Sequence, residues 1–294
     1  MVPEHIAQVR RFHRLVTQRA GALEDHFLGR DRPLGESRVL YEIGAAGADL
    51  RDLRTRLGLD SGYLSRIVQS LEAKRLIKLR PGPGDERVRR AELTRRGLAE
   101  LEEMNRRADQ VAEAILTPLT EPLQERLVSA MADVNRLLKA AGARIERVDP
   151  ADDRARWCVS QYFAELARRF ERGFDPAQSI PADDDELRPP RGAFLVASAD
   201  GEPLAGGALK STAREAASLK RMWVAESMRG LGFGRRMLSA LEAQARELGV
   251  KTLRLETNKA LVEAIRLYES SGYVEVAAFN TDPYADHWFE KQLS

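Results

Sequence analysis

The chain has 294 residues, of which 43% are hydrophobic and 31% charged, and its formal net charge is +2. Its length favours two domains, and its composition excludes disordered, collagen-like and fibrous proteins. The apolar runs are far too short to cross a bilayer, no signal peptide is recognisable, and Cys158 is the single cysteine. Cys158 and the scattered histidines do not have the spacing of a zinc site. We therefore expect a cytoplasmic protein that has neither a membrane segment nor a metal site.

Three stretches of the first half show the apolar spacing of amphipathic helices. Residues 4–28, 98–119 and 123–138 carry apolar side chains every three or four positions, which places these side chains on one helix face. Such faces could close a bundle within one chain or join two chains in a dimer. The spacing alone does not choose between these two arrangements.

Between the first two stretches, the sequence predicts two short helices joined by a tight turn. Leu50, Leu53 and Leu57 mark the first helix, which ends at Gly58, and Asp60 can cap the second. In a helix-turn-helix, the second helix enters the DNA major groove by its N-terminal end. The outward side of this helix carries small or hydrogen-bonding residues, namely Ser61, Gly62, Tyr63, Ser65, Arg66 and Gln69.

A basic hairpin is predicted next, formed by residues 76–80 and 87–93 about a Pro/Gly turn. Residues 51–96 hold 13 Lys and Arg against 6 Asp and Glu. This excess could be a solvated surface, but its place beside the second helix favours contact with phosphates. The hairpin would be a wing that carries Arg80, Arg87, Arg89 and Arg90.

Residues 1–142 resemble the MarR family of winged-helix regulators. The resemblance rests on residues 49–53, on residues 63–72, and on residues 85–87 followed by Leu93 and Thr94. It implies a homodimer formed through the terminal helices, and two reading heads on an inverted repeat of double-stranded DNA. It also implies that Arg87 reaches the minor groove while Asp85 holds it by a salt bridge.

The second half is expected to form an α/β domain over residues 143–294. Strands are predicted at residues 144–148, 194–199, 204–209, 219–224 and 252–257, with a hairpin turn at Asp200 and Gly201. Helices are predicted over residues 155–170, after the strand at 219–224, and from Asn258 onward. The acidic run 183–186 is interpreted as a surface loop.

A glycine loop lies between the strand at 219–224 and the helix that follows it. Its residues are Arg229, Gly230, Leu231, Gly232, Phe233, Gly234 and Arg235. Without side chains, the glycines let backbone amides and the helix start converge on one point, where a pyrophosphate would fit. A tight turn that simply requires glycine is the alternative. No Gly-Lys-Ser/Thr follows as in a P-loop, and no suitable acidic residue supports a dinucleotide fold.

Together with Leu255 to Asn258 and with Tyr268 before Ser-Ser-Gly-Tyr, this loop resembles the GNAT superfamily of N-acetyltransferases over roughly residues 143–294. The resemblance implies a mixed sheet, splayed at its centre, that binds acetyl-CoA. The loop from Arg229 to Arg235 would hold the pyrophosphate, backbone groups of Met222, Trp223 and Val224 the pantetheine arm, and Asn258 would contact the cofactor. Tyr268 would also contact it and protonate the leaving thiolate as the catalytic acid.

The sequence offers several candidates for the general base. Many relatives carry a glutamate at the position of Ser218, whose hydroxyl can order a water but is a poor base. Glu215, Glu226 and Glu256 are unranked alternatives, and the amine could also lose its proton directly to water.

The sequence therefore predicts a two-domain protein, a mainly α winged helix-turn-helix fused to a GNAT-like α/β domain. Its expected function is DNA-binding transcriptional regulation combined with acetyl transfer to a primary amine, of a small molecule or a protein, by direct attack. One alternative is a non-catalytic GNAT domain that senses acetyl-CoA or another ligand and so controls DNA binding. Another is that the first half serves only for dimerisation.

Overall fold

The structure is a computed structural model that describes residues 2–24, 26–82, 85–213 and 215–293. The chain divides into two compact units, Met1–Val128 and Ser129–Ser294, each with its own hydrophobic core. The division falls within helix α6 (Glu121–Gly142). The domain boundary predicted after residue 142 coincides with the end of that helix. None of the described helices is long and apolar enough to cross a membrane.

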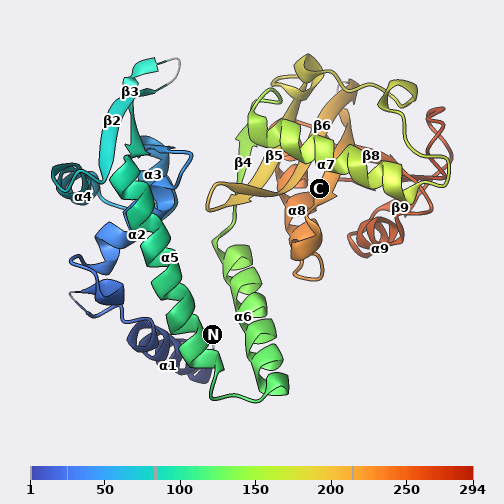
Figure 1. Cartoon of the computed structure of the whole chain (residues 1–294). Helices are drawn as coiled ribbons and strands as arrows, with labels where there is room; N and C mark the ends of the chain where they lie inside the picture. The colour runs from blue at the N-terminus through green and yellow to red at the C-terminus, as the bar shows by residue number, and fades with distance from the viewer. Residues whose placement is uncertain (1, 25, 83–84, 214, 294) are drawn as a thin grey trace. The chain divides into compact units, whose positions relative to one another are not determined.

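The first unit is mainly helical, as predicted (Figure 1). In chain order its elements are α1 (Pro3–Arg19), a 3-10 helix (Phe27–Gly29), α2 (Leu34–Ile43), β1 (Ala48–Asp49), α3 (Leu50–Leu57), α4 (Ser61–Ala73), β2 (Ile77–Gly82), β3 (Asp85–Leu93), α5 (Arg95–Leu116) and the start of α6. The strands form a small antiparallel sheet in the order β1-β3-β2. Helix α2 and strand β1 were not predicted from the sequence.

The predicted helix-turn-helix is confirmed. Helix α3 ends at Gly58, whose φ of +61° is the left-handed conformation that glycine adopts readily. The Asp60 carboxylate accepts hydrogen bonds from the backbone N–H groups of Gly62 and Tyr63, so it caps α4. The apolar face of α4 is buried as expected, through Leu64, Ile67, Val68 and Leu71.

The helix predicted over residues 4–28 is too long, because α1 already ends at Arg19. Gly21 has a φ of +65°, which breaks the helical path. The apolar stripe of α1 is exposed, and no described residue of this helix is buried. Other large apolar side chains on α5 and α6 are exposed too. The exposed set includes Ile6, Val9, Phe12, Val16, Val111, Ile115, Leu123 and Met131.

The second unit is built on a mixed sheet whose described strands lie in the order β4-β5-β6-β7-β8-β10-β9. The strands are β4 (Arg144–Val148), β5 (Gly192–Ala199), β6 (Glu202–Ala213), β7 (Ala216–Val224), β8 (Thr252–Thr257), β9 (Val274–Glu275) and β10 (His287–Gln292), and the helices are α7 (Asp153–Arg169), α8 (Phe233–Glu247) and α9 (Val262–Ser270). Short 3-10 helices lie at Pro176–Gln178, Asp184–Leu187 and Glu226–Met228. The β5–β6 hairpin turns at Asp200 and Gly201, as predicted.

Helices α7 and α8 cover opposite faces of this sheet (Figure 1). Alternate residues of a strand point to opposite faces. Accordingly, Phe194 and Val196 pack with the α7 residue Cys158, whereas Leu195 packs with Met237 of α8. Strand β5 is therefore apolar along most of its length because both of its faces are buried.

The sheet is splayed at its centre, as the sequence predicted. Strands β7 and β8 are parallel and pair only from Ala216 to Ser218, although both strands continue further. Beyond this point β7 contains an irregularity opposite Gly207, and Arg221 has a φ of +54°, which is strained for a residue with a side chain. The last residue of β7 that pairs with β8, Ser218, lies just before this irregularity.

The helix expected from Asn258 begins four residues later, at Val262 of α9. The Asn258 carboxamide explains the delay because it stabilises a turn. Its Oδ1 accepts a hydrogen bond from the Ala260 N–H, and its Nδ2 donates to the Tyr284 carbonyl. Asn258 thus ties the chain before α9 to the loop that precedes β10.

Candidate functional site

A pocket of about 440 Å³ lies where the glycine loop meets β7 and α9. We call it the glycine-loop pocket. Gly230 and Gly232 have φ values of +77° and +75°, and a Cβ at either position would meet nothing within 4 Å. Backbone conformation, not crowding, therefore requires glycine here, and Gly232 is the N-cap of α8. The positive end of the α8 dipole thus faces open space.

Most residues assigned to the cofactor from the sequence line this pocket. They are Met222, Trp223, Val224, Arg229, Gly230, Gly232, Phe233, Gly234, Arg235 and Tyr268. Leu231 is not among the lining residues, and Asn258 lines a neighbouring pocket. Because β8 does not pair with β7 beyond Ser218, the backbone groups on that edge of β7 have no strand partner there. Such an edge can pair with an extended ligand.

Arg229 is engaged by a carboxylate within this pocket. Its Nη2 lies 2.5 Å from Oε2 of Glu165, a residue of α7 that is only 8% exposed. Glu165 also contacts Arg169, and Arg169 forms an ion pair with Glu263 of α9 at 2.8 Å. A chain of alternating charges therefore runs from the glycine loop across α7 to α9. Sequence reasoning missed this chain, because its members are far apart in the sequence.

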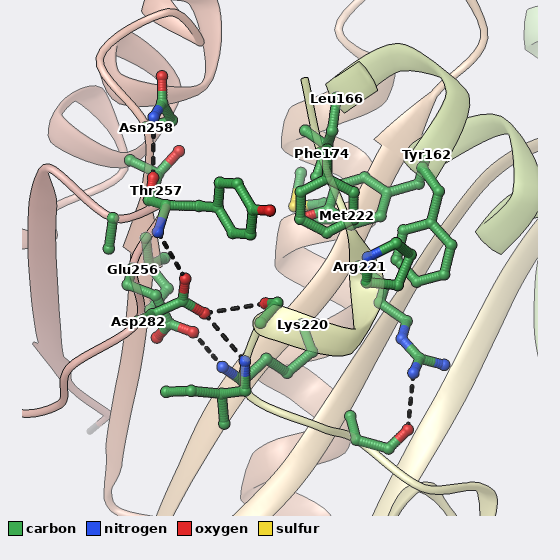
Figure 2. A pocket seen from close by; sticks show the side chains of 18 of the residues that line it. Tyr162, Leu166, Phe174, Lys220, Arg221, Met222, Glu256, Thr257, Asn258 and Asp282 are labelled. Carbon is green, nitrogen blue, oxygen red and sulfur yellow. Dashed lines mark hydrogen bonds and ion pairs between the residues drawn. The ribbon is translucent and has the colours of Figure 1, made fainter. Parts of the chain in front are cut away.

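A second pocket, of about 400 Å³, adjoins the first and shares with it Tyr162, Leu166, Met222, Leu261, Ala264 and Tyr268. We call it the aromatic pocket (Figure 2). Its wall contains a cluster of rings in mutual contact, with centroids 4.8 to 5.9 Å apart. The rings belong to Tyr162, Phe163, Phe170, Phe174 and Tyr284. Three segments of the chain supply these rings, so no local sequence motif could predict that they form one wall.

Tyr268 lies at the junction of the two pockets. It is 7% exposed, and its ring contacts those of Tyr273 and Phe289. Burial and the nearby negative charge of Glu256 raise the pKa of the Tyr268 phenol above its ordinary value. The hydroxyl therefore keeps its proton at neutral pH, as a general acid must.

Two charged groups face each other in the aromatic pocket where the strands diverge. Lys220 of β7 forms an ion pair with Glu256 of β8, and both side chains are about 10% exposed. The Asn280 amide also donates to Glu256, at 3.3 Å. A close pair of this kind is stable when buried only because each charge compensates the other.

The structure separates the four base candidates. Glu256 lines the aromatic pocket, next to Tyr268. Ser218 is buried at the last paired position of β7 and does not line that pocket. Glu215 is exposed and pairs with Lys251 at 2.8 Å, and Glu226 is exposed on a 3-10 helix. Of the four, only Glu256 shares a pocket with Tyr268.

In the first unit, the candidate binding residues of α4 all lie on its exposed side. Beside them is a groove of about 410 Å³ between α3, α4 and the hairpin. Ser61, Ser65 and Gln69 line it, together with Arg89 of β3. Arg51 and Arg54 of α3 also line it, and the remaining lining residues are Glu72 and the apolar Leu50, Leu64, Val68 and Leu79. Arg51 and Arg54 were not among the predicted DNA-binding residues, although their i, i+3 spacing places them on one helix face.

The other predicted DNA-binding residues differ in their surroundings. The Arg66 guanidinium lies 5.9 Å from the centroid of the Tyr63 ring. A Cβ on Gly35 would lie 2.4 Å from the Tyr63 hydroxyl, so this ring packs against α2. Arg80 is exposed and pairs with Glu92 at 3.4 Å. The side chains of Asp85 and Arg87 lie outside the described residues.

Arg90 is a structural member of the wing. Its guanidinium forms an ion pair with Asp49 and donates to the carbonyls of Ala46 and Gly47. These bonds attach β1 to β3. The Arg90 side chain therefore stabilises the sheet and does not reach out from the wing.

Known proteins resemble both units of the chain. A family model described as the acetyltransferase (GNAT) family matches residues 160–273, and one described as the MarR family matches residues 29–88. The chain is 32% identical over 141 residues to the IAA acetyltransferase of Azospirillum brasilense, a match that covers 48% of this chain and 88% of that protein. It is 30% identical over 125 residues to the uncharacterized N-acetyltransferase YjgM of Escherichia coli, covering 40% of this chain and 73% of that protein.

Among solved structures, an acetyltransferase of the GNAT family from Staphylococcus aureus is similar to this chain, with a TM-score of 0.41 and 15% identity. That match covers 52% of this chain and 99% of the other.

Proposed function

Because the chain belongs to the GNAT acetyltransferase family and also contains a MarR family region, we propose that it is a DNA-binding transcriptional regulator fused to an acetyl-CoA-dependent N-acetyltransferase. One observation carries the catalytic half of this proposal. Tyr268, a buried phenol that keeps its proton, lies where the glycine-loop pocket meets the aromatic pocket. An acid at such a junction can serve a donor bound on one side and an acceptor bound on the other.

The residues of the glycine-loop pocket fit acetyl-CoA. Gly230 and Gly232 leave room at the start of α8 for a pyrophosphate, and Arg229 and Arg235 supply positive charge. The unpaired edge of β7 from Met222 to Val224 would hold the pantetheine arm. When bound, acetyl-CoA supplies an acetyl group activated as a thioester.

The acceptor would be a primary amine in the aromatic pocket. The amine nitrogen bonds to the acetyl carbon, the carbon–sulfur bond breaks, the amine gives up one proton and the sulfur gains one. Tyr268 provides the proton for the sulfur, and Glu256 accepts the proton of the amine, either directly or through water. Glu256 takes this role over Ser218, Glu215 and Glu226 because only its carboxylate lines the pocket.

For the first unit, we propose that α4 reads base edges in the major groove while the basic groove binds the phosphate backbone. The exposed start of α4 and the three arginines beside it support this assignment. We further propose that two chains pair through the exposed apolar faces of the terminal helices. The pair would then bind an inverted repeat.

The proposal is tested by release of the CoA thiol when the full-length protein is mixed with acetyl-CoA and a panel of amines, amino acids and basic peptides. Turnover selective for one class of amine supports an enzyme. If acetyl-CoA raises the melting temperature but no thiol is released with any acceptor, the catalytic proposal fails. The alternative, a ligand sensor that controls DNA binding, would then be favoured.

A further inference from the structure

One cation in the aromatic pocket is not matched by a carboxylate. The Arg221 Nη2 donates to the Ala182 carbonyl at 2.7 Å, and its guanidinium lies 5.7 Å from the centroid of the Phe163 ring. In the described part of the chain it forms no ion pair. The exposed Asp183 and Asp184 favour its charge only through longer-range attraction. Two sides of its planar fork are therefore free to bind an anion.

The bulge in β7 explains why Arg221 lines this pocket at all. Side chains of a regular strand alternate between the two faces of the sheet. Here the consecutive residues Leu219, Lys220, Arg221 and Met222 all line the aromatic pocket. The positive φ of Arg221 at the bulge interrupts the alternation and adds a second cation beside Lys220. Strained backbone of this kind persists mainly where it serves a function.

Of the other charged residues that line the pocket, Lys220, Glu256 and Asp282 already have partners, and Asp183 is exposed. Lys220 is paired with Glu256. The Asp282 carboxylate accepts hydrogen bonds from the Ser179 hydroxyl and from the backbone N–H groups of Ile180 and Tyr284. Figure 2 shows the hydrogen bonds of Asp282 as dashed lines and, apart from them, the bond that Arg221 donates to a carbonyl oxygen. Asp282 therefore joins two loops through hydrogen bonds. Arg221 remains as the cation available to a ligand.

We infer that the acceptor is a small aromatic amine that also carries a carboxylate, as an aromatic amino acid does, with the carboxylate bound by Arg221 and the ring held by the aromatic wall. This inference rests on the proposed acetyl transfer. Flat rings stack well against Phe174 and Tyr284, and a volume of about 400 Å³ suits a small molecule. A guanidinium binds a carboxylate through two parallel hydrogen bonds.

The test compares phenylalanine with phenethylamine, which has the same ring and amine but lacks the carboxylate. Alanine keeps the carboxylate and amine but lacks the ring. Binding to the full-length protein in the presence of CoA is measured by calorimetry, and acetylation by thiol release. We expect phenylalanine to bind about tenfold or more tightly than either truncated ligand, because each of them forfeits one group of contacts.

Arg221→Met, which keeps much of the stem and removes the charge, should weaken phenylalanine about tenfold to a hundredfold and change phenethylamine less than about twofold. Arg221→Lys restores the charge and should recover part of the loss. Arg147→Met, at an exposed arginine of β4, is the matched control and should change neither ligand. Acetyl-CoA affinity should stay constant in all three variants.

The two proposals can fail separately. If phenethylamine binds and turns over as well as phenylalanine, or if Arg221→Met weakens both ligands equally, the inference about the carboxylate is overturned while the enzyme proposal stands. If phenylalanine binds through Arg221 but no thiol is released, the ligand class is supported and the catalytic proposal fails.

Discussion

The two units present their candidate binding groups in opposite ways. In the first unit, α4 buries Leu64, Ile67 and Leu71 and exposes its polar side, so the candidate interface lies on the surface of a complete core. In the second unit, Tyr268 and the Lys220–Glu256 pair are buried within an interruption of the sheet. A surface interface can lose a side chain with little effect on folding, whereas a buried site couples binding, charge and packing.

The largest effect on turnover is expected at the proposed catalytic acid of the buried site. Tyr268→Phe removes one hydroxyl but keeps the ring that contacts Tyr273 and Phe289. Turnover should fall about 10²- to 10⁴-fold, because the leaving thiolate loses its proton donor. Acetyl-CoA affinity and melting temperature should be nearly unchanged, as calorimetry and thermal unfolding would show. A variant with wild-type turnover would remove Tyr268 from the mechanism.

At the surface of the first unit, Phe12→Glu would place a charge on the exposed apolar stripe of α1. We expect the proposed homodimer to dissociate in sedimentation velocity, and affinity for duplex DNA to fall about a hundredfold because two linked reading heads become one. Gln18→Glu, elsewhere on α1, adds the same charge outside the stripe and is the control. Equal dimerisation by both variants would locate the dimer interface elsewhere.

Gly232→Ala separates backbone strain from ligand contact. The φ of +75° makes alanine unfavourable by roughly 1–2 kcal/mol. The added methyl group would also occupy space at the helix start, so acetyl-CoA affinity should fall about tenfold. Gly249→Ala, with a φ of +77° and equally open surroundings, should lose similar stability. If both variants bind acetyl-CoA with the same affinity in calorimetry, the loop does not hold the cofactor.

Arg54→Gln tests the basic groove through its salt dependence. Loss of one phosphate contact should reduce the slope of log K against log salt by about 1, with a loss of affinity of only a few-fold at moderate salt. A fluorescently labelled mixed-sequence duplex suffices for the measurement. Arg38→Gln, at an exposed residue of α2 outside the groove, should leave the slope unchanged. A slope unaffected by Arg54→Gln would show that this arginine makes no phosphate contact.

The smallest expected effect concerns pH: the acetylation rate should not fall under alkaline conditions. The pKa of Tyr268 lies above its ordinary value of 10.0, because burial and Glu256 disfavour the charged phenolate. The acid therefore stays protonated while the amine loses its proton, so the rate should rise with pH and show no decline up to about pH 10. A falling limb between pH 8 and 10 that disappears in Tyr268→Phe would contradict the raised pKa.

The sequence predicted those features that depend on neighbouring residues. The Asp60 cap, the Gly58 turn and the glycine loop are short-range, so their residue types reveal them directly. The aromatic pocket joins rings from residues 162 to 284, and its charge arrangement depends on where β7 separates from β8. The spacing of apolar residues in the sequence does not show where β7 stops pairing with β8. Helix α2 was missed because tertiary packing of Val39, Leu40 and Ile43 stabilises it more than its short pattern suggests.

The ion pair between Arg229 and Glu165 would be affected by any anion that binds in the glycine-loop pocket. Arg229 already has an anionic partner, so an incoming pyrophosphate would displace a carboxylate from it, as one ligand substitutes for another. The displaced Glu165 remains beside Arg169, which also holds Glu263. Helices α7 and α9 would thus redistribute their electrostatic contacts whenever the pocket is occupied. Binding in the pocket would thereby change the ionic contacts of two helices before any bond is made or broken.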